Sequence, residues 1–278
     1  MSTLQISSLL WAPNSRSPLK MAAKSSSLGD ISPTAKGDAV YRLAGNLLRP
    51  LYHLPMKIDI TGIEKLPQEG GYIVISNHLT VVDPITAAYP LFIRGVLPRF
   101  LAKEGLFRVP VLGWLMRQCA HIPVSRGSAQ AGKSLDVARN VLDAGGAVLI
   151  FPEGTLTKDP EQWPMTGKTG AARLALATGA PVIPIAHWGD HEFWPRGGKP
   201  RFGFPRKKVQ IVVGDPIDFS DLLTDTEPGA KQNRQQLADA TTRMLDCVTD
   251  LLETIRGEKA PAGRWNAVLG VRQAPENN

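Results

Sequence analysis

The sequence predicts an α/β protein with a mostly parallel central sheet that is flanked by helices. Short apolar runs recur along the chain, and stretches with the helical spacing of apolar residues lie between them. Several runs, such as YIVIS and AVLIF, are apolar almost throughout, which is typical of parallel strands buried on both faces. The 278 residues suffice for one large domain of this class with a substantial core.

The chain is expected to begin with a flexible tail over residues 1–37, which are rich in Ser, Pro and Lys. An N-terminal helix then starts at Asp38 and ends near Pro50 and Pro55, because proline interrupts a helix. The stretch MKIDIT alternates in polarity and predicts a strand over Met56–Thr61.

Four strands, each followed by a helix, come next, and two strands and a long amphipathic helix complete a single domain over residues 38–256. The expected pairs are Tyr72–Ser76 with Pro84–Phe92, Arg99–Lys103 with Val109–Arg117, His121–Ser125 with Ala131–Ala144, and Ala147–Phe151 with Thr166–Ala177. The last elements are Val182–His187, Val209–Gly214 and the helix Gln236–Arg256, with a second tail over residues 257–278.

Composition narrows the class of protein. The hydrophobic fraction of 43% and the charged fraction of 21% indicate a globular chain and exclude a disordered one. The net charge of +7 and the pI of about 9.5 favour phosphate-bearing partners, but charge alone does not choose among nucleic acid, lipid headgroups and phosphorylated substrates. Two distant cysteines and the lack of an apolar run of ~18–20 residues predict a cytoplasmic protein without a spanning helix.

The stretch SNHLTVVDP, directly after the run YIVIS, carries the first candidate site. Residues five apart on one helix point in different directions, so His78 and Asp83 meet only if His78 lies in the turn before the helix. Thr80 or Asp83 is the expected N-cap, with Pro84 in the first turn. A carboxylate bonded to one imidazole nitrogen makes the other a better base, although an isolated pair of this spacing is more often a helix cap beside a surface histidine.

Several blocks in a fixed order resemble the PlsC-like glycerolipid acyltransferases, which include the lysophosphatidic acid acyltransferases. The resemblance runs from about Lys57 to Leu222. Its blocks are NHLTVVDP, FLAKEGLFRVPVLGW, HIPVSRG, FPEGT, APVIPIAHWG and VVGDPI.

The resemblance implies a glycerol-3-phosphate acyltransferase-like fold and transfer of a fatty acyl group from acyl-CoA or acyl-carrier protein to the free hydroxyl of lysophosphatidic acid, giving phosphatidic acid. It implies that His78 is the general base and that Asp83 orients it. The same resemblance assigns substrate binding to five further residues, with the acceptor phosphate held by the first two: Lys103, Arg126, Glu153, Gly154 and Thr155. The acyl donor is a co-substrate, and neither a cofactor nor a metal is expected.

One position departs from the family. Related sequences commonly carry an arginine after EGT, whereas this chain has Leu156. Either Lys158 or Lys168 replaces the missing charge, or the acceptor is another lysophospholipid or a glycolipid.

A competing motif is GSAQAGKS, over Gly127–Ser134, which fits the phosphate-binding loop of nucleotide hydrolases. Against that P-loop NTPase hypothesis, the strand AVLIF runs into Pro152 and Glu153 without an aspartate for magnesium. A catalytically inactive lipid-binding module is a further alternative.

A basic cluster predicts contact with a membrane surface. Arg201, Arg206, Lys207 and Lys208 flank Phe202 and Phe204, and cations with aromatics suit anionic headgroups. We therefore expect a peripheral protein on the cytoplasmic side of the cell membrane and no nucleic-acid partner. The stretch HWGDHEFWP (His187–Pro195) is interpreted as an aromatic loop near the lipid site, not as a metal centre.

Overall fold

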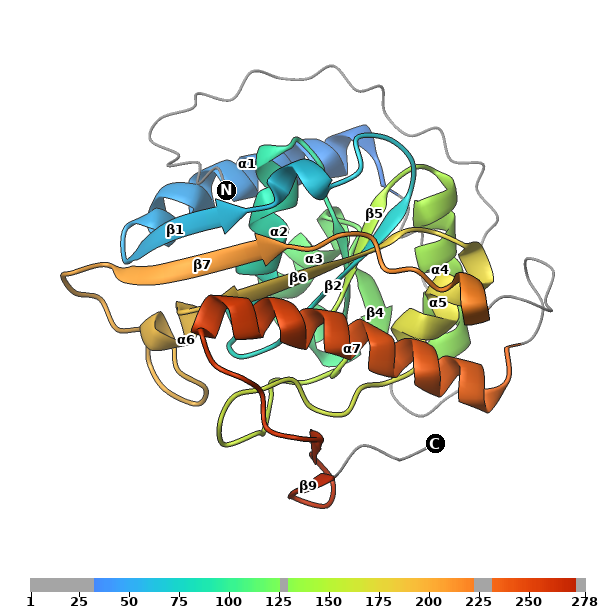
Figure 1. Cartoon of the computed structure of the whole chain (residues 1–278). Helices are drawn as coiled ribbons and strands as arrows, with labels where there is room; N and C mark the ends of the chain where they lie inside the picture. Colours follow the sequence, from blue (N-terminus) through green and yellow to red (C-terminus); the bar gives the residue numbers. More distant parts are fainter. Residues whose placement is uncertain (1–32, 126–129, 223–231, 274–278) are drawn as a thin grey trace.

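A seven-stranded sheet forms the centre of the protein, with the strand order β1-β7-β6-β2-β5-β3-β4 (Figure 1). The computed structural model describes residues 33–125, 130–222 and 232–273. The strands are β1 (Met56–Thr61), β2 (Tyr72–Ser76), β3 (Arg99–Lys103), β4 (Ile122–Val124), β5 (Ala147–Ile150), β6 (Val182–Trp188) and β7 (Lys207–Val213).

The sheet is mostly parallel, as predicted. Strands β4, β3, β5, β2 and β6 are parallel neighbours, so their carboxyl ends lie along one edge. Strand β7 pairs antiparallel with β6 and parallel with β1. Strands β7 and β1 therefore run opposite to the other five.

Helices cover both faces of the sheet and divide the core into two halves (Figure 1). On one face, α4 (Gln130–Asp143), α5 (Gly170–Thr178) and α7 (Arg234–Arg256) pack on side chains such as Ile73 and Val148. On the other face, α1 (Ala35–His53) and α2 (Asp83–Ile93) contact the alternate side chains, such as Val74 and Leu149. Strands buried on both sides explain why their sequences are apolar throughout. The remaining helical elements are α3 (Leu112–Gln118), α6 (Asp190–Phe193) and the short 3₁₀ turns Ile63–Lys65, Glu104–Arg108 and Ser220–Leu222.

Helix α1 starts three residues before the predicted position and continues through a proline. Thr34 caps it, since its hydroxyl accepts a hydrogen bond from the backbone N–H of Gly37 at 3.0 Å. Pro50 lies inside the helix, and the backbone N–H of Leu54 still bonds to its carbonyl oxygen at 3.0 Å. The helix ends at His53, between Pro50 and Pro55, near which the sequence predicts its end.

The predicted C-terminal tail also needs correction. Helix α7 ends where expected, but strands β8 (Arg264–Asn266) and β9 (Val271–Gln273) form an antiparallel hairpin after it. The hairpin folds back on the domain, because the N–H of Thr166 donates to the carbonyl oxygen of Trp265 at 3.1 Å. Arg272 also forms an ion pair with the buried Asp159 at 2.6 Å.

None of the helices that the structure describes combines the length and the hydropathy needed to cross a bilayer.

Candidate active site

Polar residues gather where the parallel strands end. His78 follows β2, Lys103 is the last residue of β3, and Glu153 follows β5. His187 lies near the end of β6, the other neighbour of β2. Because these strands run in one direction, the four side chains meet at the same edge of the sheet, where open α/β folds bind their ligands.

His78 and Asp83 are arranged as their spacing predicts. His78 lies in the turn after β2, Asp83 begins α2, and the imidazole Nδ1 is 2.8 Å from the carboxylate Oδ2. The same Oδ2 accepts hydrogen bonds from the backbone N–H groups of Leu79 and Thr80, the latter at 2.9 Å. Val82, with no side-chain bond, is the N-cap, so neither Thr80 nor Asp83 fills that position. Asp83 therefore fixes both the backbone of the turn and the orientation of the His78 imidazole.

The geometry leaves one nitrogen of His78 available for chemistry. Nδ1 faces a carboxylate and carries the proton, so Nε2 has the free lone pair. Burial disfavours the imidazolium, and the charge of His187 adds to this effect, so the pKa of His78 is lowered to about 3. The ring also stacks on Phe151 with its centroid 4.1 Å away. His78 is thus a neutral, fixed imidazole at neutral pH, as a general base requires.

Glu153 contacts the turn that carries His78. Its Oε1 accepts the backbone N–H of His78 at 3.1 Å, and its Oε2 accepts that of Met165 at 3.0 Å. Burial raises the pKa of Glu153 to about 8, while the two N–H groups oppose the shift. The carboxyl group of Glu153 therefore positions the base, besides lining the cavity described next.

A cavity of about 1460 Å³ opens beside His78. Apolar side chains from several elements line most of it, among them Leu48, Phe92, Leu101, Leu115, Met116, Leu135 and Ile150. Gly154 and Thr155, both predicted to bind substrate, also line it. An apolar space of this kind with a few polar groups at one place fits an amphiphilic ligand.

Cationic side chains are among the residues that line the cavity. Lys103, a predicted phosphate ligand, lines it together with Lys168 and Arg173. Of the two lysines considered as replacements for an arginine at Leu156, Lys168 lines this cavity, whereas Lys158 lines a separate hollow of about 230 Å³. The other predicted phosphate ligand, Arg126, lies outside the described residues.

The competing phosphate-loop motif is described in part, since Gly127 lies outside the described residues. Its serine, Ser134, is buried in the first turns of α4 and donates its hydroxyl to the carbonyl oxygen of Pro123 at 2.6 Å. That hydroxyl is engaged with the protein backbone and does not point outward as a magnesium ligand would.

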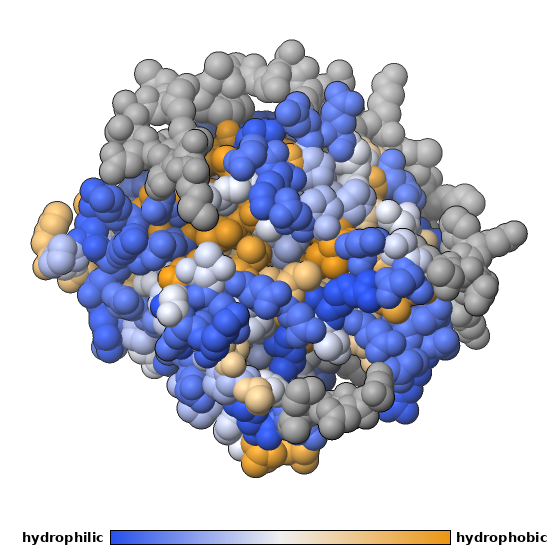
Figure 2. Space-filling view, viewed as in Figure 1, coloured by the Kyte–Doolittle hydropathy of each residue, from blue (hydrophilic) through white to orange (hydrophobic). Residues whose placement is uncertain are grey.

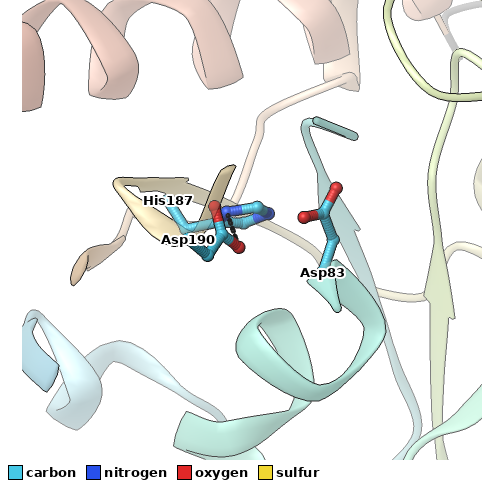
Figure 3. A group of neighbouring side chains, drawn as sticks. All are labelled: Asp83, His187 and Asp190. Carbon is cyan, nitrogen blue, oxygen red and sulfur yellow. Dashed lines mark ion pairs between the residues drawn. The ribbon is translucent and has the colours of Figure 1, made fainter. Parts of the chain in front are cut away.

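The structure contains a second buried His–Asp pair that the sequence does not predict. His187 and Asp190 were interpreted as parts of an aromatic loop, but β6 extends to Trp188 and both side chains are buried next to Asp83 (Figure 3). His187 Nδ1 lies 3.0 Å from Asp190 Oδ2. The signal in the sequence is a histidine and an aspartate three residues apart at the end of an apolar strand.

The three residues in Figure 3 also form a group with the donor types that a divalent cation accepts. One ligand atom from each of Asp83, His187 and Asp190 lies within 4.8 Å of the others. Asp83 Oδ2 is already occupied by His78 and two backbone N–H groups, so this carboxylate offers Oδ1 alone.

The hairpin β8–β9 is a further unforeseen part of the site. Ala267 and Val268, between its two strands, line the cavity near Thr166 and Lys168. Nothing in the sequence of the presumed tail indicated this contact.

The chain is similar in sequence to known acyltransferases. A family model described as Acyltransferase matches residues 57–188. A chloroplastic 1-acyl-sn-glycerol-3-phosphate acyltransferase of Brassica napus is 33% identical over 61% of this chain and 48% of its own. A 1-acyl-sn-glycerol-3-phosphate acyltransferase of Bacillus subtilis is 29% identical over 66% of this chain and 85% of its own. The chain thus spans about half the length of the plant relative and most of the bacterial one.

The crystal structure of the 1-acyl-sn-glycerophosphate acyltransferase PlsC from Thermotoga maritima superimposes with a TM-score of 0.56 at 23% identity, and the match covers 81% of each chain. This likeness supports the fold. Residues 57–188 thus match the acyltransferase family, and the relatives similar to the chain are 1-acyl-sn-glycerol-3-phosphate acyltransferases.

Proposed function

We propose that the protein transfers a fatty acyl group from acyl-CoA or acyl-carrier protein to the free hydroxyl of lysophosphatidic acid. The observation that carries this proposal is the His78–Asp83 pair, 2.8 Å apart, which opens into an apolar cavity lined by Lys103 and Lys168. The names of the relatives, which are 1-acyl-sn-glycerol-3-phosphate acyltransferases, point to the same acceptor.

The reaction follows from the free nitrogen of His78. Nε2 takes the proton of the acceptor hydroxyl while that oxygen attacks the thioester carbonyl carbon. The tetrahedral intermediate collapses, the C–S bond breaks, and the thiolate leaves with the proton that His78 returns. No acyl-enzyme is needed: Cys119 is buried, and burial raises its thiol pKa to about 11. No cofactor enters this scheme, since the acyl donor is a co-substrate.

The acceptor phosphate is assigned to the cations of the cavity. Lys103 and Lys168 line this cavity, and Lys168 supplies the charge that Leu156 does not. Arg126 stays a predicted third ligand. Another lysophospholipid or a glycolipid is the alternative acceptor, and it would need fewer cations.

We also propose that the protein works as a peripheral protein on the cytoplasmic face of the membrane. Helix α1 exposes an apolar stripe, Leu43, Leu47, Leu48, Leu51 and Leu54, of which Leu48 also lines the cavity. The predicted basic cluster adjoins the end of this helix, since Arg206 donates to the carbonyl oxygen of His53 at 3.4 Å. Phe204 beside it is 90% exposed. Figure 2 shows apolar surface gathered among hydrophilic residues on one face.

Steady-state assays of the purified protein test the reaction. Thiol release from acyl-CoA should depend on added acceptor, with lysophosphatidic acid preferred over lysophosphatidylcholine and monoacylglycerol. His78→Ala should lower kcat by ~10²–10⁴-fold, the usual range for loss of a general base. Transfer by His78→Ala at the wild-type rate would sink the mechanism, and a preference for a neutral acceptor would favour the alternative substrate.

A further inference from the structure

A second histidine–aspartate pair lies directly behind the first. Asp83 comes from the start of α2, and His187 and Asp190 come from the end of β6 and the start of α6 (Figure 3). All three side chains are 0% exposed. Figure 3 shows the carboxylate of Asp83 facing the His187–Asp190 pair. The two pairs thus form one continuous buried cluster.

The hydrogen bonds of His187 fix its protons. Nε2 lies 3.1 Å from the backbone carbonyl oxygen of Asn77, and a carbonyl oxygen only accepts, so Nε2 carries a hydrogen. Nδ1 lies 3.0 Å from Asp190 Oδ2. This distance is that of an ion pair, and in such a pair the charges of a protonated imidazole and an ionised carboxylate cancel. The side chain of Asn77 bonds to the backbone N–H and carbonyl of His187 at 3.1 and 3.0 Å, which locks this arrangement to the turn of His78.

The contact between Asp83 and Asp190 requires one more proton. Asp83 Oδ2 is occupied by its backbone donors and by His78, whereas Oδ1 is buried without a donor. The carboxyl groups of Asp83 and Asp190 nevertheless lie close together, with an oxygen of each within 4.8 Å of the other, and each affects the pKa of the other. Two ionised carboxylates in contact away from water repel strongly, and a proton between them removes both the repulsion and the missing donor.

The surroundings decide on which side this proton rests. Burial and the charge of Asp190 raise the pKa of Asp83 well above its usual range. Burial also acts to raise the pKa of Asp190, but the charge of His187 and its hydrogen bond outweigh this and lower it to about 2. The resting cluster thus holds an anionic Asp190 beside His187, a protonated Asp83 and a neutral His78.

Other polar groups around the cluster leave this balance unchanged. The hydroxyl of Thr86 bonds to Asp190 and accepts from that of Tyr52 at 2.8 Å. Burial raises the pKa of Tyr52 well above its usual range, so it stays neutral. The backbone N–H of His191 donates to Asp190 Oδ1 at 3.0 Å. Burial lowers the pKa of the His191 imidazole, so this ring stays neutral as well.

We propose that Asp83 and Asp190 share one proton and that Asp190 and His187 are positioning residues that switch the charge of Asp83 during acyl transfer. The step deepens the proposed function and rests on it. As His78 Nε2 takes the hydroxyl proton and becomes a cation, the shared proton moves from Asp83 Oδ1 to Asp190. Asp83 is then an anion facing the imidazolium. When His78 passes its proton to the leaving thiolate, the shared proton returns, and every proton is accounted for.

Infrared spectroscopy of the protein without substrate tests the shared proton. The full chain is made with aspartate carrying ¹³C in the side-chain carboxyl group and compared with unlabelled protein at pH 7. We expect a carbonyl band of a protonated carboxyl that shifts with the label, whereas a band from Glu153 would stay in place. The shifted band should disappear in Asp190→Asn, where the amide donates to Asp83 and leaves it ionised.

No label-sensitive band in the wild type would overturn the proposal. A stoichiometric divalent metal found in the purified protein by elemental analysis would overturn it too, since a cation would then replace the proton. Because this measurement needs no substrate, it stays informative if the protein does not transfer acyl groups to lysophosphatidic acid, which would refute the proposed function instead.

Kinetics test the positioning role. Asp190→Asn should lower kcat by up to about 100-fold, the cost of a small misplacement of a catalytic group, with little change in KM for either substrate. In Asp190→Asn the permanent negative charge on Asp83 also raises the pKa of His78. The acid limb of the plot of kcat against pH should therefore move to higher pH. Glu192→Gln is the matched control, because this exposed carboxylate on the same helix faces Lys207 and not the cluster. A wild-type kcat and an unmoved acid limb in Asp190→Asn would overturn the positioning role.

Discussion

Glu153 accepts a hydrogen bond from the backbone N–H of His78 at 3.1 Å and thereby ties the turn after β5 to the turn after β2. The carbonyl oxygen of His78 is held in return by the backbone N–H of Thr157 at 2.7 Å. The base is therefore fixed through its side chain by Asp83 and through its backbone by Glu153 and Thr157.

Glu153→Gln should weaken both catalysis and folding. A glutamine has one carbonyl oxygen, so its NH₂ group would face the buried N–H of either His78 or Met165. An unsatisfied buried donor costs about 1–3 kcal/mol, which urea unfolding should resolve as a lower free energy of unfolding. Glu161→Gln, at a carboxylate that is 60% exposed in the same segment, is the control. Equal stability of Glu153→Gln and the wild type would contradict the role.

Lys168→Ala should weaken binding of a phosphorylated acceptor. A charge-assisted contact is worth ~1.5–3 kcal/mol, so KM for lysophosphatidic acid should rise roughly ten- to a hundredfold while KM for the acyl donor changes little. Lys158→Ala is the matched control, since Lys158 lies outside the cavity. The measurement compares lysophosphatidic acid with monoacylglycerol, and an equal effect on both acceptors would remove Lys168 from the phosphate site.

The leucine stripe of α1 predicts the orientation on a membrane. Leu47 and Leu51 are 64% and 63% exposed, so Leu47→Glu with Leu51→Glu should leave the fold intact. Burial of each leucine in the interface contributes ~1.5–3 kcal/mol, and the double variant should bind anionic vesicles at least ~10-fold more weakly in sedimentation. Val271→Glu is the control, because the hairpin β8–β9 lies far from α1 (Figure 1). Equal losses in both proteins would argue against docking through α1.

Acid should destabilise the fold through His121. This ring is buried, and its Nδ1 accepts the backbone N–H of Phe100 at 3.2 Å. Burial, with the charge of Arg99, lowers its pKa to about 3, so the unfolded chain binds the proton first as pH falls below 6.5. The free energy of unfolding should therefore fall toward acid by up to about 1.4 kcal/mol per pH unit for this group. Urea unfolding of His121→Asn between pH 7 and 5 should show a shallower fall, and an unchanged slope would refute the assignment.

Much of the sheet could be predicted because its strands are buried on both faces. The bounds of β1, β2 and β3 agree with those expected from sequence. Helix starts were harder to predict where the backbone turns sharply. Val111 adopts a φ of 63° after Pro110, which delays α3 to Leu112. The segment before α5 is held extended by Glu153 and by the hairpin, so α5 starts at Gly170 and not at Thr166.

The site was predictable where its residues are close in sequence. His78 and Asp83 lie five positions apart, and their meeting follows from a turn and a helix start. Asp190 approaches Asp83 through the pairing of β2 with β6, where Ser76 lies opposite Ile185. This register depends on contacts between residues more than a hundred positions apart, which no local pattern reveals.

The hairpin β8–β9 affects how segments could be exchanged between this protein and its relatives. The family match ends at residue 188, yet Ala267 and Val268 form part of the cavity wall beyond it. A chimera that receives residues 57–188 from a relative would replace the segment that holds His78 and Asp83 but keep this wall from its host. The acceptor preference of the chimera would then depend on residues from both proteins. An exchange intended to transfer selectivity therefore has to include residues 264–273 as well.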